Sequence, residues 1–74
     1  MMKIPPLGVV GKVVSGHDAG LYVKVIFDLG DTGGYYVLTS NKYDFSVGFD
    51  DWIESKESLI KYFAESGWVV DWLG

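Results

Sequence analysis

The chain has 74 residues, 49% of them hydrophobic and 16% aromatic, which is the composition of a folded globular protein and excludes a disordered one. This length allows one domain, residues 1–74, and the lack of cysteine excludes a disulfide framework, a thiolate nucleophile and a Cys-ligated zinc site. The net charge is −4 and there is no arginine, the usual fork for phosphate and guanine, so we predict no nucleic-acid binding.

The charge is unevenly distributed along the chain. Residues 1–42 are close to neutral, whereas residues 43–74 carry seven acidic side chains against Lys56 and Lys61. No apolar run approaches the length of a signal peptide or a membrane span. We therefore predict a cytoplasmic protein that does not bind membranes.

Three β-rich runs separated by glycine-rich punctuation occupy the first half of the chain. They are LGVVGKVVS (7–15), LYVKVIFDL (21–29) and YYVLTSN (35–41), with GHDAG and GDTGG between them. Short β-branched runs joined in this way are typical of consecutive hairpins. We predict an antiparallel meander.

The register follows if each five-residue loop closes a hairpin, with Ser15 opposite Leu21 and Leu29 opposite Tyr35. Alternation then puts one set of side chains on the core face. This set is Leu7, Val9, Val13, Val23, Val25, Phe27, Leu29, Tyr35 and Val37. The same register places Lys12 opposite Lys24. This like-charge pair would destabilise the predicted hairpin unless a bulge intervenes or the two side chains splay apart in solvent.

The segment KYDFSVGFDD (42–51) fits neither a regular strand nor a helix. Phe45, Val47 and Phe49 alternate as a short edge strand would, but Gly48 and the flanking aspartates favour an ordered loop. We expect these three apolar side chains to pin the loop to the sheet.

An amphipathic helix is predicted next. Its apolar stripe consists of Trp52, Ile53, Leu59, Ile60, Phe63 and Ala64, and a kink or restart at Ser55 remains open. Asp50 or Asp51 can cap it, Glu54 can complete a capping box with Asp51, and Glu57 favours the helix dipole if the helix restarts.

The helix is predicted to end before Gly67 in the left-handed conformation, with Trp68 against Phe63. In the last strand, WVVDWL, an outward Asp71 would leave Trp68, Val70 and Trp72 facing the core, although a strand partly buried on both sides is equally allowed. The predicted fold class is α+β: a three- to four-stranded antiparallel sheet, with one amphipathic helix packed on one face and a C-terminal strand.

No motif indicates a reaction or a cofactor. Ser15, His17 and Asp18 lie almost adjacent in one turn, where they cannot converge as a catalytic triad. DLGDTGG (28–34) lacks the spacing of a calcium loop and the lysine of a phosphate loop. We therefore predict no enzymatic activity, no cofactor and no metal site.

Capping accounts for two or three carboxylates of the acidic half, which leaves a surplus. Exposed tyrosines beside acids are typical of protein-binding surfaces, since aromatic side chains give a large contact area at low entropy cost. The predicted partner-binding residues are Tyr43, Asp44, Asp50, Asp51, Trp52, Glu54 and Glu57. Trp52 also belongs to the predicted core stripe of the helix.

The run GFDDWIES, followed by YFAESGW and a terminal WL, resembles the C-terminal part of small acidic immunity-type proteins of bacterial polymorphic or contact-dependent toxin systems. The resemblance covers Gly48 to Leu73, about a third of the chain. It implies a stoichiometric inhibitor whose acidic face covers the active site of a toxin. It assigns no residue, so the binding residues above rest on charge alone.

We therefore predict a non-catalytic protein-binding domain that inhibits a basic partner protein, as a monomer or weak homodimer. The alternative is a self-associating structural or regulatory module that uses a sheet face or edge to complete a marginal core. A third reading is a small-molecule or metal-binding domain. Its hard oxygen ligands would be Asp44, Asp50, Asp51 and Glu54.

Overall fold

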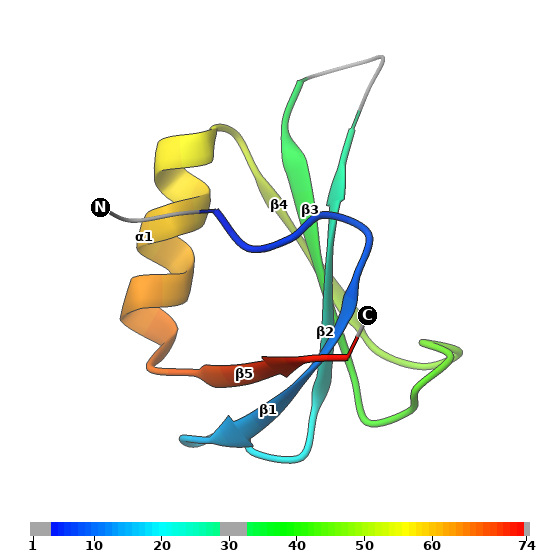
Figure 1. Ribbon diagram of the computed structural model, residues 1–74. Coiled ribbons are helices and arrows are strands. Elements are labelled where there is room, and N and C mark those ends of the chain that lie inside the picture. The colour runs from blue at the N-terminus through cyan, green and yellow to red at the C-terminus, as the bar shows by residue number, and fades with distance from the viewer. Residues whose placement is uncertain (1–3, 29–32, 74) are drawn as a thin grey trace.

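The computed structural model describes residues 4–28 and 33–73, which form one antiparallel sheet and one helix (Figure 1). The elements in chain order are β1 (Val10–Ser15), β2 (Tyr22–Phe27), β3 (Tyr35–Ser40), β4 (Phe49–Ile53), α1 (Lys56–Ser66) and β5 (Val69–Trp72). The sheet has the order β4-β3-β2-β1-β5, and every neighbouring pair is antiparallel. The predicted α+β class is confirmed, with a fourth and a fifth strand at the two edges.

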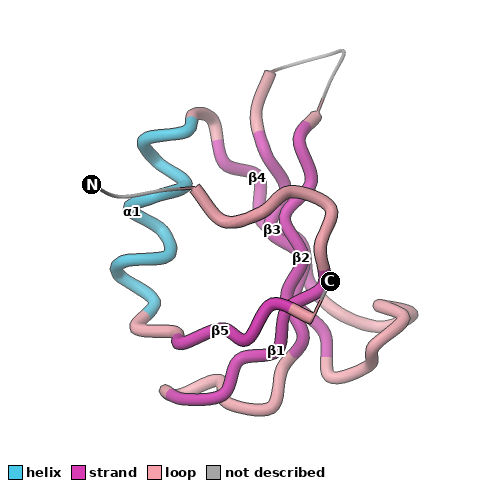
Figure 2. The backbone as a smooth tube through the Cα atoms, in the orientation of Figure 1, coloured by secondary structure: helices cyan, strands magenta, loops and turns pink. Residues whose placement is uncertain are grey.

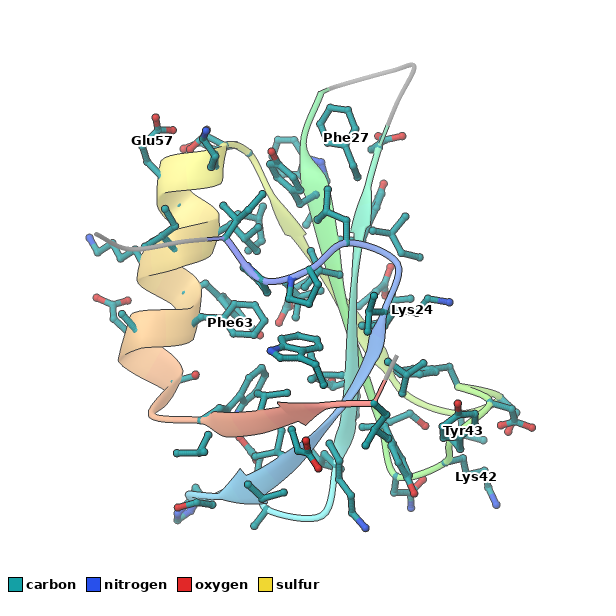
Figure 3. The ribbon with its side chains drawn as sticks, viewed as in Figure 1. Lys24, Phe27, Lys42, Tyr43, Glu57 and Phe63 are labelled. Atoms are coloured by element: carbon teal, nitrogen blue, oxygen red, sulfur yellow. The ribbon has the colours of Figure 1, made fainter. Side chains whose placement is uncertain are left out.

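The hydrophobic core lies between α1 and one face of the sheet. Its buried members are Val13, Val23, Val25, Tyr35, Val37, Ile53 and Leu59. Leu59 is the residue of α1 that is wholly buried, and Phe63 points from α1 toward the sheet (Figure 3). Burying one leucine side chain contributes about 2 kcal/mol, so this face of α1 holds the helix on the sheet.

The register of the first hairpin differs from the prediction by two residues. Val10 lies opposite Lys24 and Lys12 lies opposite Tyr22, so the predicted Lys12–Lys24 pair does not form. Instead, the Lys12 Nζ lies 5.6 Å from the centroid of the Tyr22 ring. The shift replaces a like-charge contact by a cation–π contact, and because it is an even number of residues it leaves each side chain on its predicted face.

The second hairpin shows the same shift, with Phe27 opposite Tyr35 where Leu29 was predicted. Phe27 and Leu7, which were expected in the core, are exposed, and Val9 is half-buried. Phe27 lies at the end of β2 (Figure 3). Its ring still packs on the ring of Tyr35, at a centroid distance of 5.1 Å. Leu29 lies outside the described residues.

The predicted helix start is wrong, because Trp52 and Ile53 belong to β4 and pair with β3. The helix begins at Lys56, with Ser55 as its N-cap, and the Ser55 hydroxyl oxygen accepts a hydrogen bond from the Ser58 amide at 3.1 Å. The capping box of Asp51 and Glu54 is therefore not formed. The restart at Ser55, which the sequence left open, is where α1 begins.

The end of the helix is as predicted. Gly67 follows α1 in the left-handed conformation, with φ of 71°, and the ring of Trp68 packs on Phe63 at 5.5 Å. Trp68, Val70 and Trp72 pack against the core, and Asp71 is exposed. The backbone tube in Figure 2 shows how β5 then leads away from the helix and lies along β1.

Candidate functional site

Alternation along β4 sends its neighbouring carboxylates to opposite faces of the sheet. Ile53 is buried under the helix, so Asp51 faces the helix side, whereas Asp50 and Trp52 face the side that α1 leaves uncovered, here called the open face. The Asp51 carboxylate accepts a hydrogen bond from the Tyr62 hydroxyl at 2.8 Å. The carboxylates of Asp50 and Asp51 therefore point to opposite faces of the sheet.

The remaining predicted binding residues are also spread over the molecule. Glu54 lies between β4 and α1, and Glu57 lies in the first helical turn, where its charge favours the helix dipole. Tyr43 and Asp44 lie in the loop between β3 and β4. Figure 3 shows Glu57 and Tyr43 on opposite sides of the molecule. The seven residues do not form one continuous acidic surface.

The loop between β3 and β4, residues 41–48, is held by hydrogen bonds around Ser40. This buried hydroxyl donates to the Val47 carbonyl and accepts a hydrogen bond from the Lys42 amide at 2.9 Å. Phe45 has a φ of 58°, a left-handed conformation that costs energy in a residue with a bulky side chain. The local hydrogen bonds thus hold the loop in one unusual conformation.

Asp44 has a local role within the same loop. Its Oδ1 accepts a hydrogen bond from the Ser46 amide at 3.0 Å, and this bond to the backbone is the main cause that lowers the pKa of the Asp44 carboxyl. The Asp44 carboxylate is fully exposed. It both fixes the turn and adds negative charge beside the exposed side chains of the loop.

Three large apolar side chains of this segment are exposed, and we call Tyr43, Val47 and Phe49 the loop patch. Their exposed fractions are 60%, 62% and 82%. The Tyr43 ring packs edge-on against the Tyr22 ring, with a centroid distance of 5.5 Å. The expectation that Val47 and Phe49 pin the loop to the sheet is wrong, and of the three predicted anchors Phe45 alone is half-buried.

Two hollows adjoin Phe49. One, of about 220 Å³, is lined by Leu38, Thr39, Phe45, Ser46, Gly48, Phe49 and Asp50. The other, of about 240 Å³, is lined by Leu21, Thr39, Ser40, Asn41, Val47, Gly48 and Phe49. A Cβ at Gly48 would lie 2.1 Å from the Thr39 carbonyl oxygen, so this position requires glycine for the loop to approach β3. Sequence reasoning missed Val47 and Phe49, although their alternation around Gly48 was visible.

The other candidate chemistry does not come together. Asp18 accepts a hydrogen bond from the Trp68 indole at 2.8 Å, which joins the first hairpin turn to the start of β5, and His17 is exposed in that turn. Within residues 4–28 and 33–73, no group of three or more His, Asp or Glu side chains could hold a metal ion. In that part of the chain, no helix is both long and apolar enough to cross a membrane.

Comparisons with protein-family models, with curated proteins and with solved structures found no match to this chain. The candidate site consists of the exposed loop patch, the two adjoining hollows, and the carboxylates of Asp44 and Asp50 beside them.

Proposed function

We propose that this protein is a non-catalytic protein-binding domain, and that its binding surface is the loop patch together with Asp44 and Asp50. The observation that carries the proposal is the exposure of three large apolar side chains within the seven residues from Tyr43 to Phe49. A chain of 74 residues has few apolar side chains beyond those that its core needs. Apolar side chains gathered outside the core are typical of a surface that a partner covers.

The partner is proposed to be a basic protein. Residues 43–57 hold five carboxylates, those of Asp44, Asp50, Asp51, Glu54 and Glu57, against Lys56 alone. Although these carboxylates lie on different faces, their summed field would attract a cationic partner and speed its encounter with the loop patch. Inhibition of a bacterial toxin in the cytoplasm, as the resemblance to immunity-type proteins implies, is the specific form of this proposal.

Self-association is the second candidate function, and the exposed sheet edges favour it. β4 and β5 are the two edges of the sheet, and Val69 and Leu73 are exposed at the β5 edge. Sedimentation equilibrium separates the two candidates. A monomer at micromolar concentration is expected for the binding domain, whereas a stable dimer would support the self-associating module.

The binding proposal is tested by replacing the anchors of the loop patch. A partner is first recovered by affinity selection, with Phe49→Asp as the negative bait. Its Kd is then measured by titration calorimetry against the wild type and the double variant Val47→Ala/Phe49→Ala. We expect binding to weaken about tenfold or more, since truncating a central apolar anchor costs more than about 1 kcal/mol.

The matched control is Val69→Ala, which truncates an exposed valine on β5, away from the loop. This variant should bind as the wild type does. Equal affinity of the double variant and the wild type, with both folded by circular dichroism, would contradict the proposal. Recovery of the same partner by the Phe49→Asp bait would also contradict it.

A further inference from the structure

The outer edge of β4 presents peptide groups of known direction. The Asp28 amide donates to the Gly34 carbonyl at 2.8 Å, so this pair of the β2–β3 ladder is a hydrogen-bonded one. Bonded and non-bonded pairs alternate along an antiparallel ladder, and Val37 of β3 therefore directs its peptide groups toward β4. Asp51 lies opposite Val37 and bonds back to β3. The N–H and C=O of Asp50, one residue earlier, consequently point away from the sheet.

The side chain of Asp50 lies on the same outer strand and is exposed. It faces the open side of the sheet and lines the hollow that also contains Phe45 and Phe49. Within the described residues its carboxylate has no hydrogen-bond or ion-pair partner. A peptide N–H, a peptide C=O and a carboxylate are thus presented by one residue at the sheet edge.

We propose that an extended segment of the partner pairs with the outer edge of β4 and adds a strand to the sheet. This segment places a lysine or arginine directly opposite Asp50. This inference rests on the proposed function and names the chemistry of the partner. In an antiparallel ladder, the residue opposite Asp50 would exchange two peptide hydrogen bonds with it. Its side chain would lie on the same face as the Asp50 carboxylate, within reach of an ion pair.

Pairing with a second copy of this chain is disfavoured in the register that is centred on Asp50. Symmetric antiparallel pairing of two β4 strands about Asp50 would put the Asp50 carboxylate directly opposite itself, and like charges in that position are destabilising. Charged side chains on an edge strand are also a known protection against edge-to-edge aggregation. Peptide binding separates protection from recognition, because an edge that is only protected against aggregation binds no added strand.

The test uses the whole protein and a blocked five-residue peptide of alternating lysine and valine, with lysine at its centre. Binding is followed by NMR on ¹⁵N-labelled protein. We expect the Asp50 amide resonance to shift and its hydrogen exchange to slow when the peptide is added. A peptide with glutamate in place of lysine should produce neither effect, and nor should a lysine peptide whose central amide nitrogen is methylated.

Two variants check the ion pair. Asp50→Asn keeps the side-chain shape and should weaken the lysine peptide about two- to fivefold, the range of an exposed ion pair. Glu65→Gln removes an exposed charge from α1 and should leave the affinity unchanged. An unchanged Asp50 amide at millimolar peptide, equal binding of the methylated peptide, or equal binding by Asp50→Asn would overturn the inference. If the peptide does not bind but the loop patch still binds the folded partner, this inference is overturned and the proposed function stands.

Discussion

Tyr62 and Asp51 join the helix to the edge strand through one hydrogen bond. The Tyr62 hydroxyl donates to the Asp51 carboxylate at 2.8 Å, across the rim of the core. Partial burial of the phenol, and then its bond to Asp51 and the negative charge nearby, raise the pKa of Tyr62 to about 12. The residue that was predicted to meet a partner thus has a structural use, while its neighbour Asp50 faces outward.

The raised pKa of Tyr62 predicts a pH dependence of stability. The folded-state pKa of Tyr62 lies above the ordinary tyrosine value of about 10, so the unfolded state loses this proton first. The stability that protonated Tyr62 contributes to the folded state is complete below about pH 10 and is lost as the pH rises through about 12. The free energy of unfolding from urea titrations should therefore fall over this range.

The Tyr62→Phe variant should show a shallower fall than the wild type, because it removes the titrating hydroxyl. Tyr43→Phe is the control, since it removes an exposed hydroxyl of the loop patch and leaves the Tyr62–Asp51 bond in place. Parallel curves for the wild type and Tyr62→Phe would show that the pKa of Tyr62 is not raised in the folded protein.

At the scale of elements, the β3–β4 loop is the one that connects folding with the proposed binding. The Ser40 hydroxyl bonds at both its start and its end, and the left-handed backbone of Phe45 is held between these bonds. The loop therefore holds Tyr43 and Val47 on a backbone of fixed conformation, which we call the loop frame. A fixed frame reduces the entropy that a partner must remove when it binds.

Replacement of Ser40 by alanine tests this frame. The variant removes two hydrogen bonds at a buried position, and we expect the free energy of unfolding in urea to fall by about 1–2 kcal/mol. Ser15→Ala, at an exposed position of β1, is the control and should change stability by less than about 0.5 kcal/mol. Equal stability of the two variants would show that Ser40 does not hold the loop.

At the scale of the whole molecule, a part of the apolar side chains lies in the core and another part is exposed. Valines of β1, β2 and β3, together with Ile53 and Leu59, form a small core on the helix side. Tyr43, Val47 and Phe49 are exposed outside this core, and Tyr43 lies on the side away from the N-terminus of α1 (Figure 3). The fold thus positions the loop patch beside β4, an edge strand of the sheet.

Local signals in the sequence were enough for the meander and the end of the helix. Gly67 and the Trp68–Phe63 contact follow from capping chemistry, which acts within a few residues. The start of the helix was missed because Trp52 and Ile53 fit a helical stripe and a short strand equally well. Pairing with β3 decides between helix and strand, and this tertiary contact cannot be recognised from the local sequence.

The candidate site was predicted in part. Tyr43, Asp44 and Asp50 lie at or beside the loop patch, but charge alone could not show that Asp51 would turn to the helix side. That outcome depends on the strand period, in which neighbours face opposite ways. Val47 and Phe49 were assigned to packing, because apolar residues are more often buried and no sequence pattern marks the ones that are not.

Hydrogen exchange of the complex with the recovered partner locates the binding surface without any substitution. Exchange of each amide is compared in the free and bound protein by NMR. We expect the slowing to be concentrated in residues 41–50, with residues 66–73 unchanged. Slowing confined to β5 or to the exposed face of α1, with residues 41–50 unchanged, would contradict the proposed function.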